Sequence, residues 1–134
     1  MMITMNENNN NIATILLVDN ESDNTCVLSM GLEDAGFKVD AFNDPMLALS
    51  NFKPNFYALS ILDINIPKMN GYELYKEIRK IDDKVKICIL TASEIFNESL
   101  RAPPYQLLND VKCFIPKPIA IDDFVKKVKE ELNL

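Results

Sequence analysis

Short apolar stretches alternate along the chain with segments in which apolar residues recur at helical spacing. The apolar stretches cover residues 12–18, 37–42, 56–62, 85–91 and 111–115. Three of them are nearly continuous in apolar residues, which is typical of strands covered on both faces. In the second stretch, Phe37, Val39 and Ala41 alternate with polar residues, as in a strand at the edge of a sheet. The pattern therefore predicts five strands, with the second at an edge.

Two helices are predicted between the first three strands. The first covers residues 24–36 and ends at Gly36, a natural C-terminal stop. Its apolar face follows the i, i+3, i+4, i+7 spacing at Leu28, Gly31, Leu32 and Ala35. The second begins with Asp44 as the N-cap and Pro45 at the first helical position. Its apolar positions are Leu47, Ala48 and Phe52.

Two further helices follow the third and fifth strands. Residues 72–81 place Leu74, Tyr75 and Ile78 on one side. The last helix starts at about Ile121, and Asp122 and Asp123 are favourable near its N-terminus. Its apolar stripe consists of Ile121, Phe124, Val125, Val128 and Leu132.

The segment 93–110 fits a helix poorly. Pro103 and Pro104 interrupt it, and a proline inside a helix costs about 3 kcal/mol. We expect a short helix, a break, and then an irregular stretch or a second helical turn.

This alternation of strands and helices predicts an α/β fold. It indicates an open, doubly wound, mostly parallel sheet with helices on both faces and right-handed crossovers. Residues 1–11 form an asparagine-rich polar tail with almost nothing to bury, so we expect disorder there and one globular domain over residues 12–134. In such sheets ligands gather at the carboxyl ends of the strands.

Composition excludes several kinds of function. The net charge of −6 argues against binding to a nucleic-acid backbone, which depends on clustered lysine and arginine. Histidine is absent, which excludes a Ser-His-Asp triad, a histidine-ligated zinc site and a phosphohistidine on this chain. With no signal-like start and no apolar run of the roughly 20 residues that span a bilayer, we expect a soluble cytoplasmic protein without a membrane partner.

The three cysteines, Cys26, Cys88 and Cys113, are odd in number and far apart, and none is in a C-x-x-C pair. This spacing indicates neither a disulfide framework nor a metal-binding knuckle. We therefore expect reduced core cysteines, in agreement with a cytosolic location.

Polar residues stand where the predicted strands end. Asp19 and Asn20 follow the first strand, Asp63 follows the third, Thr91 ends the fourth and Lys117 follows the fifth. Carboxylate and amide oxygens suit a hard cation such as Mg²⁺, which usually takes one or two protein carboxylates. A carboxylate beside a metal, a hydroxyl and an ammonium favours phosphoryl transfer, in which Asp63 would be the nucleophile that forms an acyl phosphate.

Four sequence pieces carry a resemblance to a known family. They are "ILLVDNE", "LDINIPKMNGYEL", "ILTAS" and "FIPKPI", in this order at the ends of the first, third, fourth and fifth strands. Over residues 12–134 the sequence resembles a response-regulator receiver domain of two-component signalling, of the stand-alone type. The resemblance implies a flavodoxin-like fold with strand order 2-1-3-4-5.

The resemblance also implies roles for individual residues. Asp63 would be the phosphoacceptor, Lys117 the phosphate-binding lysine and Thr91 the switch hydroxyl. Phe114 matches the switch aromatic, which moves inward as that hydroxyl turns, and Lys117-Pro118 matches a bond that is commonly cis. The metal ligands would be Asp19, Asn20, Asp63 and, through its backbone carbonyl, Asn65.

The partners implied are a histidine kinase or phosphotransfer protein and a downstream effector protein, and a homodimer is a further option. The chain would thus be a phosphoacceptor switch and not an enzyme, apart from its own phosphorylation and slow autodephosphorylation. One departure bears on the metal, because the family usually shows two adjacent acids where this chain has Asp19 and Asn20. We expect weaker Mg²⁺ binding than with two adjacent acids. Glu21 is expected to supply part of the missing charge.

Other interpretations stay open. Asn20 could mark a receiver-like binding module that works without phosphorylation. An aspartyl phosphatase would need a general acid where Asn65 stands, and a flavin carrier shares only the fold class. Taken singly, Asp63 could be a turn residue and Phe114 a core aromatic.

Overall fold

The structure is a computed structural model, and it describes residues 12–64, 71–92, 111 and 113–134. The predicted polar tail, the predicted metal ligand Asn65 and the segment 93–110 lie outside the described residues. For these parts the predictions remain predictions.

Five parallel strands form one sheet. They are β1 (Thr14–Val18), β2 (Lys38–Phe42), β3 (Leu59–Asp63), β4 (Lys86–Ala92) and β5 (Cys113–Lys117). Their order is β2-β1-β3-β4-β5, and every neighbouring pair is parallel. This confirms the predicted α/β fold with its 2-1-3-4-5 order, and β2 is an edge strand as its alternation indicated.

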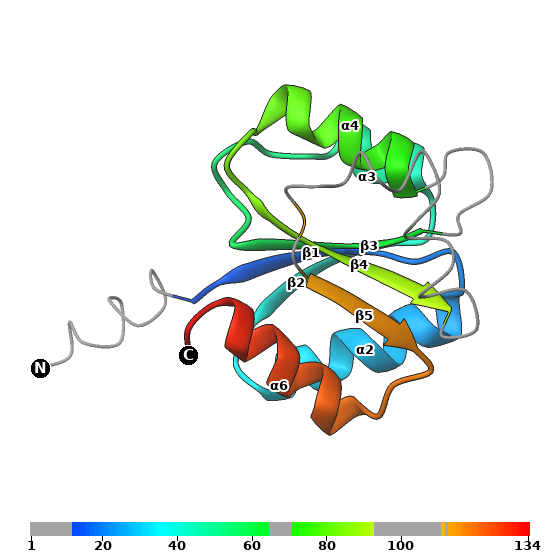
Figure 1. The fold of residues 1–134 in the computed structure, drawn as a ribbon, viewed down its shortest axis with the longest axis vertical. Helices are drawn as coiled ribbons and strands as arrows, with labels where there is room; N and C mark the ends of the chain where they lie inside the picture. The colour runs from blue at the N-terminus through cyan, green and yellow to red at the C-terminus, as the bar shows by residue number, and fades with distance from the viewer. Residues whose placement is uncertain (1–11, 65–70, 93–110, 112) are drawn as a thin grey trace, which may run out of the picture.

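Helices cover both faces of the sheet. The described helices are α2 (Ser22–Asp34), α3 (Pro45–Ser50), α4 (Gly71–Ile81) and α6 (Ile121–Glu131). Figure 1 shows α2 and α6 on one side of the sheet and α3 and α4 on the other. None of the described helices is long and apolar enough to cross a bilayer.

Two apolar layers result, one on each face. In β1, Ile15 and Leu17 face the α2 and α6 side, whereas Leu16 and Val18 face the α3 and α4 side. All four are fully buried, because a central strand in a parallel sheet is covered on both faces. The strand ends that carry polar residues are thereby held on a rigid core.

Capping residues explain where the helices start and stop. The Asp44 side chain accepts a hydrogen bond from the Met46 N–H, with Pro45 at the start of α3, as predicted. Gly36, just after α2, has a φ of 100°, which is the left-handed region that favours glycine. The Leu47 side chain, predicted on the apolar face of α3, is instead 55% exposed.

The third strand begins later than predicted. Residues 56–58 belong to a turn region before β3, in which Asn55 has a φ of 60°. The Asn55 N–H donates to Asp82, and the Tyr57 hydroxyl donates to Asp40 at 2.7 Å. These polar contacts hold residues 56–58 in a turn, although their apolar composition predicts a strand.

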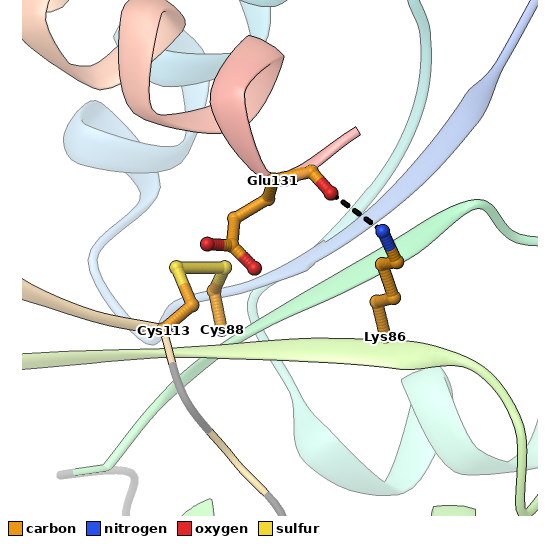
Figure 2. Close-up of a disulfide and its surroundings, with 4 residues drawn as sticks. All are labelled: Lys86, Cys88, Cys113 and Glu131. Carbon is orange, nitrogen blue, oxygen red and sulfur yellow. Dashed lines mark hydrogen bonds between the residues drawn. A yellow bond between two sulfur atoms is a disulfide. The ribbon is translucent and has the colours of Figure 1, made fainter. Parts of the chain in front are cut away.

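Cys88 and Cys113 are core residues as predicted, but the expected reduced state was wrong for this pair, and the core position was wrong for Cys26. Cys88 in β4 and Cys113 in β5 form a disulfide with a Cα–Cα distance of 4.6 Å (Figure 2). Cys26 is exposed on α2. The strand register explains the pair, because Cys88 lies directly opposite Cys113 in the β4–β5 ladder. A separation of 25 residues along the chain hides that proximity from the sequence.

Candidate functional site

The predicted polar residues meet at the carboxyl edge of the sheet. Val18 pairs with Leu62, so Asp19 follows β1 at the level where Asp63 ends β3. Asp63 pairs with Leu90, which places Thr91 one residue further along the neighbouring strand. Lys117 pairs with Ala92 at the end of β5. The ladder therefore brings four distant segments to one place.

Lys117 bridges the acidic groups of this site. Its Nζ donates a hydrogen bond to Asp63 Oδ2 at 3.0 Å and lies 3.6 Å from Asp19 Oδ2. The side chains of Asp63 and Asp19 are 1% and 0% exposed, while that of Lys117 is 20% exposed. Two buried carboxylates thus face one ammonium, which offsets the unfavourable burial of like charges.

The charges around Lys117 determine its protonation. Burial by itself lowers the pKa of the Lys117 ammonium, but the hydrogen bond and charge of Asp63 raise it, assisted by Asp19 and Glu21. The balance holds the pKa of Lys117 above its ordinary value. Lys117 is therefore a permanent cation at neutral pH.

A hydrogen-bond network fixes the orientation of Asp19. Asp19 Oδ1 accepts from the Glu21 N–H at 3.1 Å, and Oδ2 accepts from Asn24 Nδ2 at 2.6 Å. The Asp19 backbone carbonyl accepts from Thr25 Oγ1 at 3.0 Å and Asn43 Nδ2 at 3.1 Å. Charge-assisted bonds of this kind hold a carboxylate in one direction.

Asn24, Thr25 and Asn43 are contributors that the sequence reasoning missed. The sequence offered only an indirect signal for Asn24 and Thr25. A helix that begins just after a strand places its first turn over the end of that strand. Asn24 and Thr25 lie in that first turn of α2, and Asn43 follows β2, the neighbour of β1. Their amide and hydroxyl groups are common at helix starts, which made them unremarkable in the sequence.

The other predicted residues have different surroundings. Thr91 is buried, with 2% exposure, at the end of β4. Phe114 is partly buried and packs against the apolar layer on the α3 and α4 side. Asn20 is exposed directly after β1. The Lys117-Pro118 bond is cis, as the resemblance implied.

The oxygen atoms of this site fit a hard divalent cation. Asp19 and Asp63 offer buried carboxylate oxygens on neighbouring strands, and the Glu21 Oε1 atom lies 3.9 Å from Lys117 Nζ at the mouth of the same site. Such a set matches the one or two carboxylates that Mg²⁺ usually takes, with water completing its shell. The described residues of the site contribute oxygen ligands and no sulfur.

Comparisons with known proteins agree with this geometry. The response regulator receiver domain family matches residues 15–129. The transcriptional regulatory protein CpxR homolog of Haemophilus influenzae is 41% identical over 122 residues, which are 91% of this chain and 51% of that protein. This chain spans about half the length of the curated relatives it matches.

Solved structures show the same fold. The non-phosphorylated HemR receiver domain of Leptospira biflexa has a TM-score of 0.78 at 27% identity, covering 91% of this chain and 95% of that one. A CheY-like receiver domain protein of Methanospirillum hungatei has a TM-score of 0.75 at 25% identity, covering 91% and 94%.

Proposed function

Because the chain belongs to the response regulator receiver domain family, we propose that it is a phosphoacceptor switch whose Asp63 receives a phosphoryl group from a partner histidine kinase. Phosphorylation on aspartate, Mg²⁺ binding and contacts with kinases and effectors are general features of receiver domains. We further propose that residues 12–134 form the working unit.

The observation that carries this proposal is the bridge from Lys117 to Asp63 and Asp19. Asp63 ends a buried strand, and its carboxylate is hydrogen-bonded to the ammonium at 3.0 Å. A phosphoryl group that arrives at Asp63 therefore meets a fixed positive charge. Phosphoryl transfer depends mainly on such positioning and charge stabilisation.

The transfer step involves one carboxylate oxygen. This oxygen of Asp63 attacks phosphorus, a P–O bond forms, and the P–N bond of the donor phosphohistidine breaks with its electron pair moving to the imidazole nitrogen. No histidine occurs in the 134 residues, so the donor phosphohistidine lies outside them. Lys117 would hold a phosphoryl oxygen as charge accumulates there.

Asp19 and Asp63, with Asn20 and the backbone of Asn65, would hold Mg²⁺ in this scheme. A bound Mg²⁺ supplies positive charge that reduces the repulsion between the carboxylate and the phosphoryl oxygens. Asn24 donates a hydrogen bond to Asp19 Oδ2. This bond holds the carboxylate in one orientation, so that its remaining lone pairs keep a fixed direction.

The switch would use Thr91 and Phe114. The phosphoryl group adds a charge of about −1.5 to −2, which attracts the Thr91 hydroxyl as a donor. Phe114 is partly buried and packs against the apolar layer on the α3 and α4 side, and in this scheme its ring would move further inward. The changed surface would then be recognised by an effector protein.

Phosphorylation of the purified protein tests the proposal. Wild type and Asp63→Asn are incubated with Mg²⁺ and a small phosphodonor such as acetyl phosphate, and their intact masses are measured. We expect a mass increase of one phosphoryl group in wild type and none in Asp63→Asn. Asp83→Asn, which changes an exposed carboxylate outside the site, serves as the matched control and should be phosphorylated.

Two controls complete the experiment. Chelation of Mg²⁺ should abolish the mass increase, and Lys117→Met should reduce it strongly while leaving the fold intact by circular dichroism. A wild-type protein that stays unmodified at saturating Mg²⁺ would contradict the proposal and favour a binding module that works without phosphorylation.

A further inference from the structure

The disulfide between Cys88 and Cys113 lies apart from the phosphoacceptor site. The two cysteines are 0% and 1% exposed and belong to the apolar layer on the α2 and α6 side of the sheet. Nothing in the proposed phosphorylation uses them. A sulfur pair in this position therefore calls for an explanation of its own.

Strand pairing positions the two cysteines independently of the bond between them. Cys88 and Cys113 are register partners in the β4–β5 ladder, with Cα atoms 4.6 Å apart. Disulfides are compatible with Cα–Cα distances of about 4.4–6.8 Å. Because the backbone ladder fixes that separation, the two thiols remain neighbours when the bond is broken. The fold can thus hold both the dithiol and the disulfide.

The end of α6 covers the sulfur atoms. Figure 2 shows the Glu131 carboxylate directed toward the disulfide, and its oxygen lies within 4.8 Å of both sulfurs. Lys86 Nζ donates to the Glu131 backbone carbonyl at 2.7 Å, which fastens the last turn of α6 to β4. The Glu131 carboxylate and the last turn of α6 therefore lie beside the two sulfur atoms.

We propose that Cys88 and Cys113 are a modification site, a reversible dithiol–disulfide couple that exchanges with low-molecular-weight disulfides. The same three groups could in principle ligate a metal, but here the sulfurs are bonded to each other and offer no thiolates. Within the described part of the chain, Glu131 is the one further ligand of that cluster. The geometry thus favours redox exchange over metal binding.

The exchange requires the last turn of α6 to move aside, because both sulfurs are buried beneath it, and it balances with a glutathione-type disulfide as oxidant. One cysteine loses its proton and attacks a sulfur of the oxidant, so that a mixed disulfide forms and one small thiol leaves with that proton. The second cysteine, also deprotonated, then attacks the protein sulfur of the mixed disulfide. The Cys88–Cys113 bond forms and a second small thiol leaves, so two thiols are oxidised and one disulfide is reduced.

Glu131 is expected to slow reduction of the disulfide. Its carboxylate lies beside both sulfurs and repels an incoming thiolate by like charge.

A redox titration tests the couple. In the Cys26→Ser background, which removes the exposed thiol, the protein is equilibrated in glutathione buffers of increasing oxidation, denatured, alkylated and weighed intact. We expect two alkyl groups at the reducing end, none at the oxidising end, and a single transition for a two-electron couple. Two alkyl groups at every ratio, or stable glutathione adducts on both cysteines, would overturn the proposal.

The role of Glu131 has its own matched pair of variants. Glu131→Gln should be reduced by dithiothreitol several-fold faster than the Cys26→Ser parent, because the repelling charge is gone. Glu130→Gln removes the same charge from the adjacent, exposed position and should match the parent rate. Equal rates in the two variants would overturn the part assigned to Glu131.

Discussion

Asn20 and Glu21 follow Asp19 at the mouth of the site. The amide at Asn20 supplies an oxygen but no charge, and its side chain is exposed. Glu21 lies 67% exposed with Oε1 3.9 Å from Lys117 Nζ, so it adds a weak, solvent-screened charge at the mouth of the site. The acidic character of the pocket therefore rests mainly on Asp19 and Asp63.

Restoring the missing charge should strengthen metal binding. Two unit charges about 4 Å apart attract by roughly 4 kcal/mol at an effective dielectric near 20, and dehydration cancels most of this. We expect Asn20→Asp to gain about 1 kcal/mol, which lowers the Kd for Mg²⁺ roughly five- to tenfold. Titration calorimetry measures this directly, without phosphorylation.

Two further variants control the measurement. Glu21→Gln should raise the Kd only slightly, about twofold, since exposed charges interact weakly. Glu33→Gln removes an exposed charge near the other end of α2 and should leave the Kd unchanged. If the Asn20→Asp protein binds Mg²⁺ no better than wild type, the absence of a charge at position 20 does not limit the affinity for the metal.

At the scale of elements, Asp82 joins the end of α4 to β4 and to the turn before β3. Its carboxylate accepts from three backbone N–H groups, those of Asn55, Lys84 and Val85, at 2.9, 3.0 and 3.2 Å. We expect Asp82→Asn to lower the free energy of unfolding by about 1–3 kcal/mol, since the amide loses the charge and an acceptor oxygen. Urea denaturation at pH 7 measures the change.

The effect of Asp82 depends on pH in a defined direction. Burial raises its pKa, but the three backbone hydrogen bonds and Arg79 outweigh this and hold the pKa below its ordinary value. A lowered pKa means that the stabilisation is fully present above the unfolded value, about 3.9, and is lost as pH falls through the folded-state value. Wild type and Asp82→Asn should therefore differ least at acid pH. A difference that grows below about pH 4 would contradict this.

The contact between α2 and α6 depends on Gly31. A Cβ atom there would lie 2.7 Å from Ile121 Cγ2, on a branched side chain that has little freedom to move aside. Overpacking costs about 1–3 kcal/mol and the better helix propensity of alanine returns about 1, so Gly31→Ala should destabilise the fold by about 1 kcal/mol.

A double-mutant cycle identifies the cause of that loss. If the contact with Ile121 is responsible, Gly31→Ala should cost less in an Ile121→Ala background, with a coupling of about 1 kcal/mol by urea denaturation. Strictly additive effects would place the cause elsewhere in α2.

The strands and helices could largely be predicted. A strand buried on both faces shows a nearly continuous apolar run, and a helix shows apolar residues at helical spacing. The placement of Asp63, Thr91 and Lys117 at one edge could be predicted too, since parallel strands bring their carboxyl ends together there; their roles in phosphorylation stay predictions. Register could not be predicted. The Cys88–Cys113 pair depends on how β4 aligns with β5, and the contact of Asn24 with Asp19 depends on the rotation of α2 over β1. Neither leaves a periodic signal in the sequence.

For the molecule as a whole, the sulfur pair lies on β4 and β5, two of the four strands that contribute to the acidic site. Cys88 stands three residues before Thr91 in β4, and Cys113 stands four residues before Lys117 in β5. The proposed phosphoacceptor site lies at the carboxyl edge, whereas the sulfur pair lies within the apolar layer on the α2 and α6 side. A covalent link there restrains β5, which among the described strands pairs only with β4.

Reduction should therefore lower the stability of the whole chain. Closing a loop between residues that are 25 apart removes conformational freedom from the unfolded state, worth about 3 kcal/mol in the chain-entropy account. For a domain of this size, that corresponds to a fall in Tm of about 10 °C. Scanning calorimetry of the Cys26→Ser protein with and without a phosphine reductant measures it. Cys113→Ser, which cannot form the bond, should unfold at the same temperature under both conditions, and an equal Tm for oxidised and reduced Cys26→Ser protein would mean that the strand ladder alone sets the stability of β5.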